Sequence, residues 1–366
     1  MIRKPGKIAF AFGGLGGFNA HGVGFLQAAK ELGVVPEIIS CTSGMIGWVA
    51  DWIAGKDLEK LISEQIIEDN KFPPPLDWMN SIWTATFGNP RIFRPAIPEY
   101  WARWLEPVRQ FAPEVIFDKL MPSQLYVPLR TQDDFQDIAT VLSSSSIPIM
   151  FNSFHPHSGR PYLHVNAAAC DFLNVRYGDF DGPGKYLPIN TEAVSGALWL
   201  YFYGFSRQDN PRGLVDGAYN RQFIIREMHC CDRIYAARPQ STRWLGRLPQ
   251  NWFETQDFNT ELWFNSAYLA EIAGIDQINK LLERKKISDS EFHHVDIIPV
   301  EIHHQYGYFQ YFVEERSVYE NGYNEAYRAL LRHEFNTQKD GTKDLTPAEK
   351  KAKASRSRQE TLPADG

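Results

Sequence analysis

Short apolar runs alternate with glycine-rich turns and longer amphipathic segments at the start of the chain. A buried strand is predicted over Lys7–Phe12, followed by a glycine-rich turn at 13–17 and a helix over Ala20–Leu32. A second strand is expected at Val34–Cys41, and an apolar helix at Met45–Ile53 follows a tight turn. This order of strand, helix, strand and helix is typical of an α/β fold with a mainly parallel sheet and right-handed crossovers.

The pattern changes between residues 70 and 130, which hold three consecutive prolines and many aromatic residues. We expect there an insertion of irregular structure and short helices that packs over the sheet. From its end onward, the pattern predicts strands at 124–130, 147–153, 162–169, 231–237 and 295–302 and a loop at 143–146. It predicts helices at 255–285 and 314–333, and a helix or helix-turn at 192–203. Residues 336–366 are polar and rich in Lys and Arg, which is typical of a disordered tail. Residues 1–335 are therefore predicted to form the folded domain.

Composition narrows the classes of function. The chain has 366 residues, 43% of them hydrophobic and 22% charged, and a net charge of -6, which argues against a nucleic-acid-binding protein. No stretch approaches the roughly 18 apolar residues of a membrane span. The four cysteines form no disulfide framework, so we expect a protein of the reducing cytoplasm. Aromatic residues make up 14% of the chain, which raises the question of whether they pack a core or bind an apolar ligand.

The glycine-rich turn at 13–17 allows two chemistries. A dinucleotide-binding fingerprint would need a third glycine, but Asn19 stands at that position, and no acidic residue ends the second strand. Alternatively, glycines between a strand and a helix expose backbone N–H groups near a helix N-terminus, where a phosphate or a transient oxyanion is stabilised. Because the ends of adjacent parallel strands face one crevice, the residues after the second strand decide between the two.

Two side chains could supply the reactive groups of such a crevice. Ser43 lies in the turn between the second strand and its helix, which is the place of a nucleophile elbow, although Cys41 and Met45 replace the glycines of the usual G-x-S-x-G pattern. A helix N-cap is the other interpretation of Ser43. Asp216 is predicted at a strand end before Gly217, where a buried carboxylate can act as the base for a serine. A plain Asp-Gly turn is the alternative there.

The order of glycine loop, serine turn and distant Asp-Gly pair resembles that of the patatin-like phospholipases, a family of lipid acyl hydrolases. The resemblance covers residues 7–237 and rests on the segments IAFAFGGLGGFNAHGVGFLQAAKELGV, PEIISCTSGMIGWVADWIAG, EAVSGALWLYFYGF, GLVDGAYNRQFI and CDRIYAARP. It implies a three-layer α/β/α fold, cleavage of a lipid carboxylic ester through an acyl-enzyme, and no metal or organic cofactor. It also implies a lipid or other acyl-ester substrate, and the composition leaves a peripheral contact with a membrane surface open.

The same resemblance assigns roles to individual residues. Ser43 would be the nucleophile and Asp216 the base. The oxyanion hole would use backbone amides of Gly14, Leu15, Gly16, Gly17 and Gly44. The chain departs from the family at Phe18-Asn19, where the family carries a basic residue followed by glycine. This departure and the altered elbow affect the expected rate and substrate choice more than the fold.

Other interpretations stay open from the sequence. The same serine and aspartate would serve an acyltransferase or a polyester depolymerase, and an altered elbow also fits a lipid-binding protein without catalysis. His155 and His157 share a strand face, as two metal ligands would, but no cysteine or carboxylate completes a zinc set. His21, next to the glycine loop, could line the crevice, but a helix-capping or packing role is favoured. The aromatic stretch Trp78–Trp104 is expected either to cover the Ser43 crevice as an acyl-binding lid or to pack beside it.

Overall fold

The computed structural model describes most of the chain up to residue 335. The described residues are 4–73, 75–77, 79–105, 113–120, 122–181, 184–205, 210, 212–288, 292–304 and 308–335. The expected tail 336–366 and Trp78 lie outside them.

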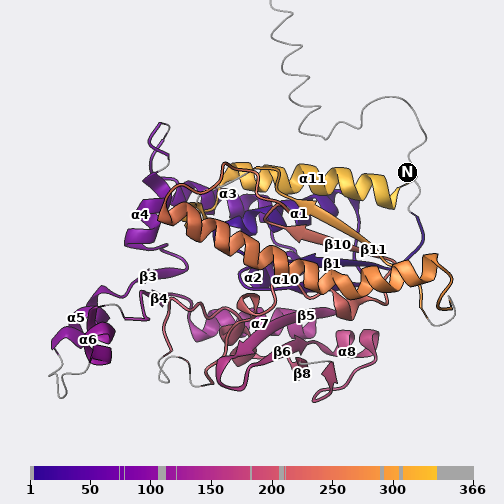
Figure 1. Ribbon diagram of the computed structural model, residues 1–366, viewed down its shortest axis with the longest axis horizontal. Coiled ribbons are helices and arrows are strands. Elements are labelled where there is room, and N and C mark those ends of the chain that lie inside the picture. Colours follow the sequence, from indigo (N-terminus) through magenta and orange to yellow (C-terminus); the bar gives the residue numbers. More distant parts are fainter. Residues whose placement is uncertain are drawn as a thin grey trace, which may run out of the picture.

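A mainly parallel sheet forms the centre of the molecule (Figure 1). Its strand order is β11-β10-β1-β2-β5-β6-β8-β7, with β9 paired to β5. The pairs from β11 to β5 are parallel, whereas β5 pairs antiparallel with β6 and β9, and β7 with β8. The strands are β1 (Ile8–Phe12), β2 (Ile38–Cys41), β5 (Ile149–His155), β6 (Arg160–Val165), β7 (Phe180–Asp181), β8 (Gly184–Pro188), β9 (Val215–Asp216), β10 (Arg233–Arg238) and β11 (Asp296–Glu301).

Helices cover both faces of this sheet, which confirms the three-layer α/β/α class. One face packs against α1 (Asn19–Leu32), α2 (Met45–Ile53), α3 (Leu58–Asp69), α7 (Gln132–Ser144), α9 (Thr191–Ala197) and α11 (Arg316–Glu334). The other face packs against α8 (Ala167–Leu173) and the long α10 (Trp252–Glu283). Figure 1 shows α1 beside α11, and α10 running across the sheet. None of the helices in the described part of the chain is both long and apolar enough to cross a membrane.

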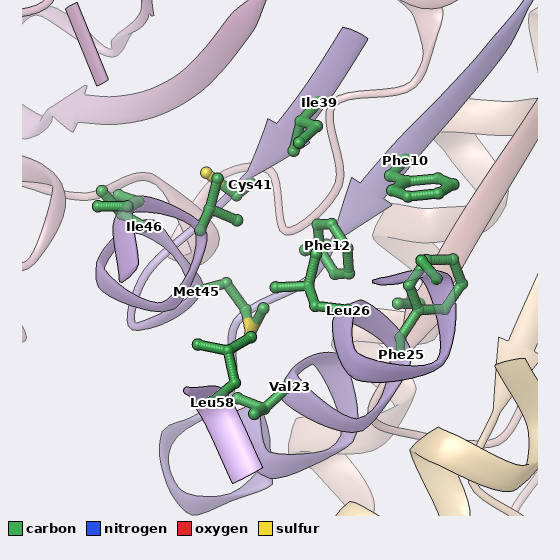
Figure 2. Close-up of a cluster of buried hydrophobic side chains, with 14 of the residues drawn as sticks. Phe10, Phe12, Val23, Phe25, Leu26, Ile39, Cys41, Met45, Ile46 and Leu58 are labelled. Carbon is green, nitrogen blue, oxygen red and sulfur yellow. The ribbon is translucent and has the colours of Figure 1, made fainter. Parts of the chain in front are cut away.

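The core is anchored by the side chains of β1. Successive residues of a strand point to opposite faces, so Phe10 and Phe12 share one face, and both contact Phe25 of α1 edge-on, with ring centroids 4.8 and 5.3 Å apart. Figure 2 shows these rings beside Leu26. Cys41 of β2 and Met45 of α2 lie in the same cluster. This packing fixes the carboxyl end of β1, where the glycine loop begins.

The described residues between 70 and 130 hold short helices and a small ribbon, of which α5 (Ile97–Leu105) and α6 (Pro113–Leu120) do not lie over the sheet as expected. The other elements are α4 (Met79–Phe87), β3 (Phe93–Pro95) and β4 (Tyr126–Pro128). β3 and β4 pair antiparallel outside the central sheet, so the strand predicted at 124–130 belongs to this ribbon. Figure 1 shows α5 and α6 together and away from the sheet, and α5 exposes Trp101 and Trp104 to solvent.

Several predicted boundaries were wrong, each for a local reason. The second strand begins at Ile38 and not at Val34, because the amide of Val34 still closes the end of α1 by donating to Ala29 O. The strand predicted over 162–169 ends at Val165, since the Asn166 side chain accepts from the Ala169 amide and caps α8. The segment 192–203, predicted as a helix or a helix followed by a turn, holds α9 up to Ala197 and turns after it.

Three helices outside residues 70–130 were not predicted: α3, α7 and α8. Helix α7 runs from Gln132 to Ser144 and includes the first residues of the predicted loop at 143–146. Thr131 and Asp134 form a capping box at its start, which is a sequence signal for a helix N-terminus.

Candidate active site

The glycine loop and the serine turn lie directly against each other. β1 and β2 pair in parallel with Phe12 opposite Cys41, so their carboxyl ends are neighbours. The Gly14 amide donates to Thr42 Oγ1 at 2.9 Å, and this hydroxyl donates in turn to the carbonyl of Gln222 at 2.9 Å. A Cβ on Gly14 would lie 2.3 Å from the Thr42 carbonyl oxygen, so only glycine permits this approach.

Ser43 occupies a strained backbone position between β2 and α2. Its φ of 53° lies in the left-handed region, which a non-glycine residue rarely adopts. A strained strand-to-helix turn of this kind presents the serine hydroxyl outward. The N-cap of α2 is Gly44, and no side-chain hydrogen bond caps this helix, so the alternative of Ser43 as a capping residue is wrong.

The unusual flanks of the serine turn are accommodated in the core. Cys41 and Met45 are buried and point away from the turn into the cluster of Figure 2. Met45 packs on Gly22 of α1, where a Cβ would lie 2.6 Å from its sulfur. A Cβ on Gly44 would lie 2.1 Å from Asn19 Nδ2, so a larger residue directly after Ser43 would have to displace the Asn19 side chain. The large Met45 side chain therefore does not block the serine.

Asp216 lines the same cavity as Ser43, although it comes from a segment far downstream in the sequence. It ends the two-residue strand β9, which pairs antiparallel with β5 so that Asp216 lies opposite Ser153. One carboxylate oxygen accepts from the Ala218 amide at 2.8 Å. Asp216 is 1% exposed, and this burial raises its pKa to about 7, although the nearby Ser43 side chain and the Ala218 amide act in the opposite direction.

Of the five backbone amides expected in the oxyanion hole, two already have hydrogen-bond partners in the structure. The Gly14 amide is bonded to Thr42, and the Leu15 amide donates to Asn19 Oδ1 at 3.1 Å, so neither is free to bind an oxyanion. Gly16 and Gly17 are the first residues of a 3-10 helix (Gly16–Phe18), whose leading amides have no partner in their own helix. Within the described residues, no acceptor binds the amides of Gly16, Gly17 or Gly44.

A cavity of about 260 Å³ lies over the Ser43 and Asp216 side chains, both of which line it. Aromatic residues from distant segments form much of its wall, including Phe93, Tyr126, Tyr203, Tyr219, Trp263 and Tyr311. The insertion thus contributes through its ribbon, whereas Trp83, Trp101 and Trp104 are not among the lining residues. Trp83, Trp101 and Trp104 of the aromatic stretch therefore do not cover the site, and aromatic residues further along the chain line it instead.

Sequence reasoning missed a polar part of the same cavity. Gln65 and Asp69 lie one turn apart on α3, and Asn89 and Glu314 join them in the lining. Burial raises the pKa of Asp69 to about 6 and raises that of Glu314 well above its usual value, with the neighbouring Asp69 adding to the effect. These residues follow no spacing pattern that a single sequence could reveal. Only their closeness in the fold groups them.

No histidine is among the described residues that line the cavity. His155 bonds to Ser158 at 2.8 Å, and its ring centroid is 6.0 Å from that of His157. His21 is buried, and desolvation lowers its pKa to about 3, which leaves a neutral ring outside the cavity lining. Among the described residues, no three His, Cys, Asp or Glu side chains are grouped as metal ligands would be.

Comparisons with known proteins give limited information. No protein-family model matches the chain, and no curated protein matches it. Among solved structures, the chain is similar to VipD from Legionella pneumophila, with 11% identity, a TM-score of 0.32, and coverage of 91% of this chain and 68% of that one. The geometry of the site is therefore the basis for any functional assignment.

Proposed function

We propose that the protein is a serine hydrolase that cleaves lipid carboxylic esters, in the manner of the patatin-like phospholipases that its sequence resembles. The observation that carries the proposal is that Ser43, held at a φ of 53°, and the buried Asp216 line one aromatic-walled cavity, with Ser43 near enough to lower the pKa of the Asp216 carboxyl. A serine becomes a nucleophile when an adjacent base accepts its proton. A carboxylate with a pKa near 7 suits that task at neutral pH.

The proposed reaction runs through an acyl-enzyme. Ser43 Oγ attacks the carbonyl carbon of the ester while Asp216 accepts the hydroxyl proton. The amides of Gly16, Gly17 and Gly44, which have no acceptor in the described chain, stabilise the oxyanion. Asp216 then gives its proton to the departing alcohol. Water attacks the acyl-enzyme as Asp216 takes its proton, and the fatty acid leaves as Ser43 regains its hydroxyl.

The cavity suits an apolar acyl chain. Aromatic side chains dominate its wall beside Ser43, and burial of apolar surface drives the binding of such a ligand. The rest of the proposal follows the expectations from the sequence: residues 1–335 act as one hydrolase domain, no metal or organic cofactor takes part, and the protein works in the cytoplasm in peripheral contact with a lipid surface.

An esterase assay tests this proposal. We expect the purified protein to hydrolyse p-nitrophenyl octanoate, and Ser43→Ala to lose this activity while keeping the wild-type unfolding temperature. Ser146→Ala is the matched control, because Ser146 is an exposed loop serine whose removal should leave the rate unchanged. Wild-type activity in Ser43→Ala, or its absence from the wild-type protein, would refute the hydrolase proposal.

A further inference from the structure

The polar wall of the cavity consists of Gln65, Asp69, Asn89 and Glu314. It adjoins the glycine loop, because Glu314 Oε2 accepts from the amide of Ala20 at 3.1 Å, at the start of α1. The Glu314 amide donates to Asp69 Oδ2 at 3.0 Å, and Asn89 Nδ2 donates to Asp69 Oδ1 at 2.9 Å. The wall therefore places two buried carboxyl groups side by side in the chamber that holds Ser43.

Gln65 differs from the other members of the polar wall. Its side chain is only 8% exposed and lines the cavity, yet it makes no hydrogen bond within the part of the chain that the structure describes. Since Gln65 is absent from the fully buried side-chain atoms that lack a partner, its amide borders the cavity space, where its donor and acceptor are available to a ligand. Asp69, Asn89 and Glu314 hold parts of the fold together through their hydrogen bonds. The amide donor and acceptor of Gln65 have no such use.

Charge limits which ligand could bind there. No Lys, Arg or His occurs among the described residues that line the cavity. A phosphate next to Asp69 and Glu314 would lose its water and meet carboxyl groups instead of cations. Hydroxyl groups fit better, because they donate to carboxyl oxygens and accept from the Gln65 amide.

We propose that the polar wall binds the alcohol part of the ester and selects leaving groups that carry free hydroxyls and no phosphate. A monoacylglycerol has this chemistry, with its acyl chain against the aromatic wall and its glycerol hydroxyls at Gln65 and Asp69. The assignment of a leaving group rests on the proposed hydrolase function. The binding preference itself does not need turnover and can be measured without it.

Binding to a Ser43→Ala protein tests the polar wall. The probes are 1-O-octylglycerol, its 3-phosphate, the choline ether of the same chain length, and 1-octanol, measured by calorimetry at pH 8. We expect octylglycerol to bind at least about tenfold more tightly than its phosphate. Gln65→Met should weaken octylglycerol about two- to tenfold, the effect of one hydrogen bond, and leave octanol unchanged. Gln132→Met, at an exposed position on α7, is the control and should change neither.

Three results would overturn the proposal. The phosphate could bind as tightly as octylglycerol, Gln65→Met could leave octylglycerol binding unchanged, or the choline ether could bind more tightly than the glycerol ether. Asp69→Asn is less informative, because Asp69 also holds Asn89 and the Glu314 amide. If octylglycerol binds as expected while the wild-type protein hydrolyses no ester, the hydrolase proposal fails and the polar wall stands as a binding site.

Discussion

The Gly14 amide donates a 2.9 Å hydrogen bond to the hydroxyl of Thr42, the residue directly before Ser43. Thr42 also donates to the carbonyl of Gln222, six residues after Asp216. One buried hydroxyl thus links the glycine loop, the serine turn and the segment that follows the aspartate. The relative position of these three parts decides whether Ser43, Asp216 and the loop amides can act on one ester carbonyl.

Thr42→Val should lower kcat for an octanoate ester by roughly tenfold with little change in KM. Valine has a similar volume but offers no acceptor to Gly14 and no donor to Gln222. Thr42→Ser restores the hydroxyl and should recover most of the lost rate. Steady-state kinetics on the three proteins checks this positioning role. An equal loss in both variants would mean that Thr42 acts through packing of its methyl group.

Gly44→Ala should disrupt the site, because the new Cβ would lie 2.1 Å from Asn19 Nδ2. Overpacking of this kind costs about 1–3 kcal/mol, and here it also displaces the side chain that holds the Leu15 amide. Gly274→Ala is the matched control, since nothing lies within 4 Å of a Cβ at that helical position. Urea unfolding of the two variants gives the comparison. Equal stability and equal activity in both would contradict the packing described for Asn19.

The rate should depend on the ionisation of Asp216. Burial raises its pKa to about 7, and only the ionised form can accept the Ser43 proton. We therefore expect kcat/KM to rise with pH and to level off above an apparent pKa near 7. A pH profile on an uncharged ester measures this directly. A profile that is flat between about pH 5 and pH 9 would exclude Asp216 as the base.

Asp216→Asn should make the protein more stable at high pH. The folded-state pKa of about 7 lies above the ordinary value of 3.8, so the unfolded chain ionises first as the pH rises. Stability from this group is therefore present at about pH 4 and is lost as the pH rises through 7. Asparagine does not titrate and can still accept from the Ala218 amide. Urea unfolding should show the variant gaining on the order of 3 kcal/mol relative to the wild type between about pH 4 and pH 8. Parallel stability curves would contradict the burial of an ionisable Asp216.

Local signals predicted the part of the fold that positions the site. Apolar runs flanked by glycines marked β1, β2 and their helices, and the parallel pairing of these strands brought the glycine loop to Ser43 as expected. The placement of Asp216 next to Ser43 depended on the family resemblance. Nothing local shows that a two-residue strand will pair antiparallel with β5.

The rest of the site could not be predicted, because it depends on contacts between distant segments. Gln65 and Glu314 are separated by most of the chain. In the sequence, each is a single polar residue in or next to a helix, and no motif singles it out. The sequence also did not show which loop amides are already bonded, because Gly14 and Leu15 donate to the side chains of Thr42 and Asn19. The role of the many aromatic residues was also not predictable. The sequence pointed to residues 70–130, but Tyr219, Trp263 and other residues outside that segment also line the cavity.

Covalent labelling of Ser43 tests the central claim most directly. The purified protein is treated with a fluorophosphonate, and the modified residue is identified by mass spectrometry in the wild type and in Asp216→Asn. We expect one adduct, on Ser43, and labelling at least about 100-fold slower in the variant, because the base is gone. An adduct on another residue, no adduct, or an unchanged labelling rate in Asp216→Asn would contradict a serine activated by this aspartate.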